Sequence, residues 1–76
     1  MNRAEGHRKV GEWIRRNRER KGVSQRVLAR QIGKTQGYVS AIERGRRVDL
    51  VTLAQIADAL KIDIRGVLAA VRGAKG

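Results

Sequence analysis

The chain lacks cysteine and proline, and it contains one histidine. Without cysteine, disulfide bonds and thiolate metal sites are excluded. No apolar run approaches the roughly 18 residues that a membrane-spanning helix needs. The N-terminal segment MNRAEGHRKV has no apolar core, so we do not expect a signal peptide. His7 and the scattered carboxylates form no evident acid–base pair, which argues against an enzyme, a metal site or another cofactor.

The chain has the length and composition of one small globular domain. It has 76 residues, of which 41% are hydrophobic, a content too high for a disordered basic tail. No linker, internal repeat or low-complexity stretch divides it. We expect a domain over residues 8–72, preceded by a flexible basic N-terminus (1–7) and followed by a flexible tail (73–76).

Acidic residues are scarce, and the excess of positive charge is uneven. The chain has 18 lysines and arginines against 7 aspartates and glutamates, a net charge of +11. Residues 1–22 hold eight basic and three acidic side chains, and residues 23–47 hold six basic side chains and one acidic one. Residues 48–76 hold four basic and three acidic side chains. This segregation predicts a binding face for an anionic partner within the first 47 residues, with nucleic acid ahead of an anionic membrane surface.

Apolar residues recur at helical spacing, and a glycine or a capping residue marks most helix boundaries. The fold class is therefore all-α, with five short helices. The first covers about residues 8–21 and ends before Gly22. The predicted N-caps of the other four are Ser24, Thr35, Asp49 and Asp63. Leu50 and Leu68 are expected on inward faces of the last two helices.

The stretch over residues 25–44, QRVLARQIGKTQGYVSAIER, has the pattern of a helix-turn-helix unit. It combines a small residue where two helices cross, a turn glycine and four core positions. In such a unit the second helix enters the DNA major groove. The positions are Ala29, Gly33, Leu28, Ile32, Val39 and Ile42.

Over about residues 10–70 the sequence resembles the Cro and phage-repressor class, also called the XRE family. Small members include controller proteins of restriction–modification systems, phage repressors and antitoxins. The resemblance implies a compact five-helix, lambda-repressor-like fold, operator DNA as ligand and usually a homodimer. Lys34 departs from the pattern, because the family usually has an apolar residue after the turn glycine. The matching residues are Ile14, Arg18, Gly22–Val23–Ser24–Gln25, Leu28–Ala29, Gly33, Ser40, Ile42–Glu43, Gly45, Ile56–Ala57 and Leu60.

The start of the predicted third helix is the expected reader of DNA bases. Gln36 can form two hydrogen bonds with an adenine edge, and the resemblance implies that role. Gly37, Ser40 and Ala41 complete the expected base-contacting face. Since this face has few long side chains, we expect part of the specificity to come from DNA shape.

Other residues are expected to contact the DNA backbone. Gln25 begins the second helix, where its amide and the helix N-terminus can meet a phosphate, and the resemblance implies the same use. Tyr38 can contact a phosphate, rest on a thymine methyl or cover the edge of the core. The remaining expected backbone contacts are Lys34, Arg44, Arg46, Arg47, Arg15 and Arg26.

Two further expectations concern contacts that hold the helices together. The resemblance implies a partly buried ion pair between Arg18 and Glu43, the only acid between residues 20 and 48. Trp13 is expected to pack against the C-terminal helix, since a lone exposed tryptophan is uncommon.

The nearly neutral C-terminal part carries more apolar side chains than so small a core evidently needs. We expect a two-fold dimer interface there, although the same residues could simply complete the core. Two recognition helices about 34 Å apart would then read a pseudo-palindrome. The expected interface residues are Val51, Ile62, Ile64 and Val67.

We therefore expect a sequence-specific regulator of transcription that binds double-stranded DNA in the cytoplasm, at the nucleoid, without a small-molecule effector. Two alternatives stay open. One is an antitoxin that binds a toxin protein as well as DNA. The other is a basic module that binds a membrane surface or a protein, which stronger binding to liposomes than to DNA would favour.

Overall fold

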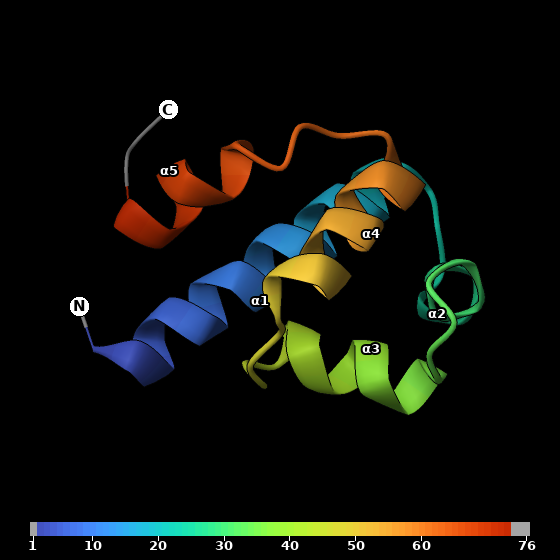
Figure 1. The fold of residues 1–76 in the computed structure, drawn as a ribbon, viewed down its shortest axis with the longest axis horizontal. Helices are drawn as coiled ribbons and strands as arrows, with labels where there is room; N and C mark the ends of the chain where they lie inside the picture. Colours follow the sequence, from blue (N-terminus) through green and yellow to red (C-terminus); the bar gives the residue numbers. More distant parts are fainter. Residues whose placement is uncertain (1, 74–76) are drawn as a thin grey trace.

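The computed structural model describes residues 2–73, which form five helices and no strand (Figure 1). The expected all-α fold with five helices is confirmed. Residues 74–76 of the expected flexible tail lie outside the described residues. No helix within residues 2–73 is long and apolar enough to cross a membrane. The helices are α1 (Arg3–Arg20), α2 (Gln25–Gln31), α3 (Gln36–Glu43), α4 (Leu50–Leu60) and α5 (Gly66–Arg72).

Three of the four predicted N-caps are confirmed. Ser24, Thr35 and Asp49 each accept a hydrogen bond from the backbone N–H three residues later, at 3.1, 3.1 and 2.7 Å. These bonds satisfy donors that a helix start leaves without partners. Hydrogen bonds from Thr52 N and Oγ1 also hold the pKa of Asp49 below its usual range. The starts of α2, α3 and α4 are therefore determined by local sequence.

The first helix begins five residues earlier than expected. Asn2 Oδ1 accepts a hydrogen bond from Glu5 N at 2.8 Å, and this cap starts α1 at Arg3. The expectation of a flexible segment over residues 1–7 is thus corrected for residues 3–7, which form the first turns of the helix. An asparagine just before a helix provides the same capping oxygen as serine or aspartate.

The fifth helix begins later than Asp63 predicts. The Asp63 carboxylate accepts from Arg65 N at 2.8 Å and pairs with Arg65 Nη2 at 2.6 Å. These contacts lower the pKa of Asp63 to about 2, and the side-chain hydrogen bond from Arg65 has the largest effect. Asp63 therefore stabilises the turn that precedes α5, and the helix starts at Gly66 without a side-chain cap.

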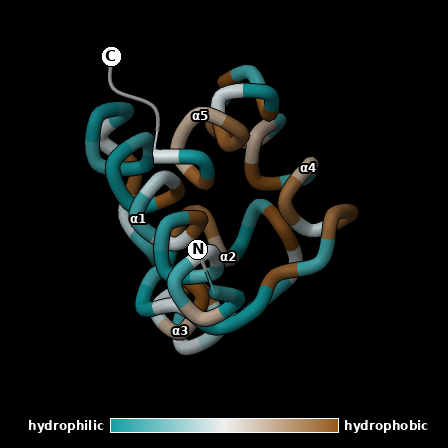
Figure 2. Tube along the Cα trace, turned by 90° about the vertical axis from the view of Figure 1, so that its left-hand side faces the viewer, coloured by the Kyte–Doolittle hydropathy of each residue, from teal (hydrophilic) through white to brown (hydrophobic). Residues whose placement is uncertain are grey.

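Helix α1 lies between α3 on one side and α5 on the other (Figure 1). Figure 1 shows α2 nearly end-on while α3 runs across the view, which agrees with the large crossing angle expected of a short glycine-containing turn. Figure 2 shows brown, hydrophobic stretches in α4 and α5, whereas α1 is largely teal. The largest fully buried side chains are Ile14, Leu28, Val39, Ile42, Ile56 and Leu60.

The tryptophan expectation is confirmed, but two leucines are not where we expected them. Trp13 is buried, and a Cβ atom at Gly66 would lie 3.3 Å from its Nε1, so α5 packs directly on the indole. Leu50 and Leu68, expected on inward faces, are 73% and 51% exposed. Helical spacing predicts a stripe of apolar positions, but this small core is too narrow to cover its edges.

Helices α1 and α3 approach each other backbone to backbone at Gly11. A Cβ atom there would overlap the carbonyl oxygen of Ile42 and lie 2.8 Å from that of Glu43. Backbone atoms cannot move aside as a flexible side chain can. Glycine is therefore required at this crossing for steric reasons.

The expected ion pair between α1 and α3 is present and buried. Arg18 Nε lies 2.6 Å from Glu43 Oε2, and Arg18 Nη2 lies 3.0 Å from Oε1. Arg18 Nη1 also donates to the Val23 carbonyl at 2.9 Å. The side chains are 10% and 3% exposed. The hydrogen bonds to Glu43 raise the pKa of Arg18 above its already high value, so its charge is permanent.

We predict that Gly11→Ala lowers the free energy of unfolding by about 1–3 kcal/mol, because the added methyl group separates α1 from α3. Urea denaturation measures the change. Gly37→Ala is the matched control, since a Cβ there would meet only Thr35 Oγ1 at 3.9 Å. That control should raise stability by about 1 kcal/mol through helix propensity. Equal effects of the two substitutions would contradict the close helix approach.

We predict that Glu43→Ala lowers the free energy of unfolding by about 3–5 kcal/mol, because it leaves the Arg18 guanidinium buried without its partner. Thermal denaturation at neutral pH measures the loss. Glu12→Ala is the control, since this exposed residue of α1 takes part in no ion pair within residues 2–73, and it should change the free energy of unfolding by less than about 0.5 kcal/mol. An unchanged melting temperature of Glu43→Ala would show that the pair does not hold α1 against α3.

Candidate nucleic-acid interface

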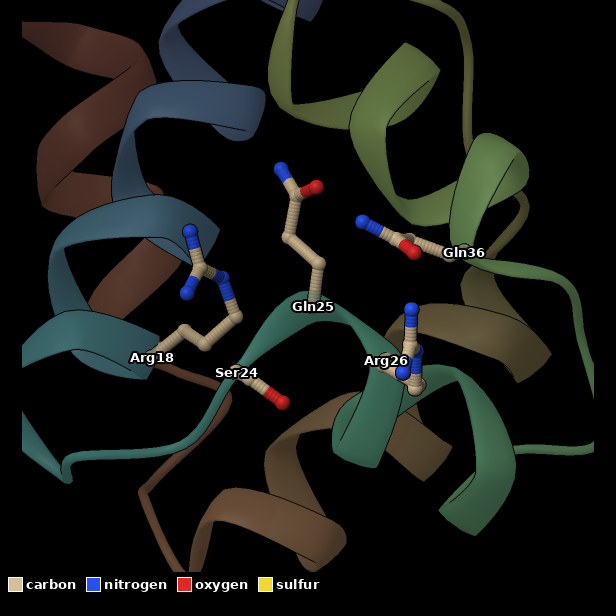
Figure 3. Close-up of a pocket in the computed structure, with 5 residues that line it drawn as sticks. All are labelled: Arg18, Ser24, Gln25, Arg26 and Gln36. Carbon is tan, nitrogen blue, oxygen red and sulfur yellow. The ribbon is translucent and has the colours of Figure 1, made fainter.

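An open hollow of about 480 Å³ lies where α1, α2 and α3 meet. Three side chains predicted to contact DNA, Gln25, Arg26 and Gln36, line it together with Arg18 and Ser24 (Figure 3). The sequence places these glutamines 11 positions apart, and the tight turn after α2 brings both helix starts to one side of the domain. The hollow is polar, as a surface that meets a DNA strand needs to be.

Gln25 is fixed to the buried ion pair. Its Nε2 donates to Glu43 Oε1 at 2.9 Å, the oxygen that also accepts from Arg18 Nη2. In Figure 3 the Gln25 amide lies between Arg18 and Gln36. We did not predict this bond from the sequence, although the scarcity of acids around Glu43 was a signal that this carboxylate had several partners. The bond uses one amide N–H and leaves the second available to a ligand.

The start of α3 is accessible from outside the domain. Gln36 and Gly37 are exposed, whereas Ser40 and Ala41 are half-buried. Gly37 has no intramolecular requirement for glycine, since added atoms would meet only open space and Thr35 Oγ1. Of the four expected base contacts, the first two therefore offer the most surface to a ligand.

Residues 20–48, which contain α2 and α3, carry many exposed positive charges and no exposed negative charge. Glu43 is the only acid between residues 20 and 48, and its side chain is 3% exposed. All the lysines and arginines in this segment are exposed: Arg20, Lys21, Arg26, Arg30, Lys34, Arg44, Arg46 and Arg47. We call this set the cationic face. Burial of Glu43 leaves only positive charge exposed in this segment, and Asp49, which follows the segment, interacts with Lys34 alone among these cations.

Two of the expected backbone contacts have other neighbours. Arg15 does not line the hollow, and its Nε pairs with Glu19 Oε2 at 3.3 Å on the exposed side of α1. Tyr38 is half-buried and packs against the core, as one of our three interpretations of it required. Contact of Arg15 and Tyr38 with DNA stays a prediction.

The expected dimer surface is only partly exposed. Val51 is 69% exposed, and Ile62 and Ile64 are half-buried, but Val67 is 9% exposed and belongs to the core. The expectation that Val67 offers surface to a second copy is corrected, because α5 turns this side chain toward the domain interior. Leu50 and Leu68 supply exposed surface instead and, with Leu53, Ile64, Arg65 and Val67, line a shallow hollow of about 190 Å³.

Comparison with known proteins gives a family and several similar structures. The helix-turn-helix family matches residues 14–67. Two crystal structures of the clp gene regulator ClgR from Corynebacterium glutamicum are similar to this chain. One has a TM-score of 0.84 and 35% identity, and the match covers 90% of this chain and 73% of that chain. The other structure has a TM-score of 0.83 and 32% identity, and the match covers 93% of this chain and 94% of that chain. No curated protein sequence matches significantly.

The restriction-modification controller protein C.AhdI from Aeromonas hydrophila is also similar, with a TM-score of 0.82 and 37% identity over 88% of this chain and 99% of that chain. The match to the family covers the second part of α1, all of α2, α3 and α4, and the start of α5. Family and neighbours together exclude the enzyme alternative. The chain therefore belongs to the helix-turn-helix family of DNA-binding proteins of the Cro and phage-repressor (XRE) class.

Proposed function

We propose that this chain regulates transcription by binding a specific sequence of double-stranded DNA as a homodimer. The observation that carries the proposal is the cationic face, which comes from the segment that contains α2 and α3 and whose only carboxylate is buried. Phosphate contacts supply affinity and position, while base contacts supply specificity. The cationic face can supply the phosphate contacts, and the exposed Gln36 at the start of α3 can supply a base contact.

The roles divide between the two helices of the unit. Gln36 at the start of α3 reads a base edge, and Gly37 beside it lets the helix approach the DNA closely. Gln25 contacts a phosphate with its remaining amide N–H, and it is held in place by Glu43. The arginines after α3 contact the sugar–phosphate backbone. Among the similar structures, ClgR is described as a gene regulator and C.AhdI as a controller protein, which supports a regulatory role.

The homodimer is proposed from the apolar surface of α4 and α5. Leu50, Val51 and Leu68 expose more than half of their area, and Ile64 continues the patch. Contiguous apolar surface rimmed by polar residues is typical of a protein–protein interface. Since residues 48–76 carry nearly balanced charge, a second copy can pack here without strong repulsion.

Selection of bound sequences from a random DNA library tests the proposal. We expect an enriched two-fold-symmetric sequence whose half-sites are one helical turn apart. Enrichment of a single half-site would support specific binding but not the dimer. The absence of any enriched sequence, with tight capture of a toxin-like protein or of anionic vesicles instead, would favour one of the two alternatives.

We predict that Gln36→Ala and Arg46→Ala weaken DNA binding in different ways. Gln36→Ala should cost about 1–3 kcal/mol on the selected sequence and little on random DNA, because it removes a base contact. Arg46→Ala should weaken both complexes similarly and reduce the salt dependence by about one phosphate contact. Fluorescence anisotropy across a salt series measures both effects. The reverse pattern would show that the two roles are assigned wrongly.

We predict that Leu68→Glu raises the dissociation constant of the dimer at least about tenfold, since one buried leucine contributes about 1.5–3 kcal/mol. The monomer should stay folded because Leu68 is 51% exposed. Sedimentation velocity measures the change. Gln31→Glu, which adds the same charge at an exposed position on α2 and outside the apolar patch, is the control. An unchanged dimer in Leu68→Glu would place the interface elsewhere.

A further inference from the structure

Three side chains from different segments stack along one flank of α3. Lys34 Nζ lies 5.1 Å from the centroid of the Tyr38 ring, and Arg46 Cζ lies 5.6 Å from it. Lys34 precedes α3 and Arg46 follows it. The chain turns back after the helix, where Arg46 N donates to the Ala41 carbonyl at 3.0 Å, and this returns the arginine toward the ring.

Lys34, the lysine that follows the turn glycine, lies against the Tyr38 ring. The family pattern has an apolar residue at this position, yet the turn keeps its shape because Lys34 N donates to the Ala29 carbonyl at 2.9 Å. The lysine thus lies against the ring without disturbing the turn, and a cation occupies a place that usually carries no charge.

Both cations remain available to a ligand. Lys34 and Arg46 are exposed, and within residues 2–73 neither has a carboxylate within 4.0 Å. The Asp49 carboxylate is engaged in capping α4 through Thr52. Tyr38, in contrast, is half-buried against the core, so its ring supports two exposed side chains.

We propose that Tyr38 is a positioning residue whose ring holds Lys34 and Arg46 as a paired clamp for one phosphate strand beside the recognition helix. The face of the ring positions the two cations, and the Tyr38 hydroxyl is not needed for this role. The inference rests on the proposed DNA-binding function and assigns Tyr38 an indirect part in it. Ordering two long cationic side chains before binding reduces the entropy that the complex otherwise loses, and the quadrupole of the ring attracts both charges.

The test is a double-mutant cycle on a random-sequence DNA duplex, read by anisotropy over a salt series. Tyr38→Phe should bind within about twofold of wild type, because the ring face remains. Tyr38→Leu should bind about fivefold to thirtyfold more weakly, with a shallower salt dependence. Lys34→Gln should weaken the wild type but have little further effect in Tyr38→Leu. Arg46→Gln should behave in the same way.

The controls separate positioning from folding and from total charge. Arg72→Gln removes one exposed charge on α5, which packs on the opposite side of α1 from α3. This control should leave the coupling energies of Tyr38 with Lys34 and with Arg46 unchanged. Melting temperatures of all variants test folding, and Tyr38→Met provides a second non-aromatic replacement that keeps apolar packing.

Two outcomes would overturn the inference. One is an equal loss in Tyr38→Phe and Tyr38→Leu, which would assign the role to the hydroxyl. The other is additive effects of Tyr38→Leu and Lys34→Gln, which would show that the residues act independently. If the wild type binds neither this duplex nor the sequence selected from the random library, the proposed function fails. If it binds and the effects are additive, only the clamp fails.

Discussion

The buried ion pair between Arg18 and Glu43 is the interaction on which the rest of the arrangement depends. It connects α1 to the C-terminal end of α3 through two hydrogen bonds, and the same carboxylate accepts from Gln25 at the start of α2. One carboxylate thus connects three helices. Its burial also removes the only negative charge of residues 20–48 from the surface. Stability and the electrostatics of the proposed DNA interface therefore have a common origin.

The ion pair requires a close approach of two helices, and Gly11 permits that approach. At this crossing the backbones of α1 and α3 are so near that a methyl group would overlap two carbonyl oxygens. The short distance places Glu43 within reach of Arg18 without an extended, entropically costly side chain. The resulting frame holds the exposed start of α3 at a defined angle, which a helix that reads base edges needs.

The domain has two exposed surfaces of different chemistry. The cationic face surrounds α2 and α3, and the exposed apolar patch belongs to α4 and α5. Helix α1 separates α3 from α5 (Figure 1). The proposed dimer and the proposed DNA complex therefore use different side chains.

The sequence alone determined the features that depend on neighbouring residues. Ser24, Thr35 and Asp49 start their helices because each oxygen meets an N–H three residues later, and the resemblance to a known family identified the ion pair. Only the tertiary structure decided the rest. Leu50 and Leu68 have core-like spacing, but the width of the packed core leaves them exposed. The bond from Gln25 to Glu43 and the stack of Lys34, Tyr38 and Arg46 join residues from separate segments. Periodicity describes the faces of single helices, whereas such contacts depend on how the helices and turns are placed against one another in space.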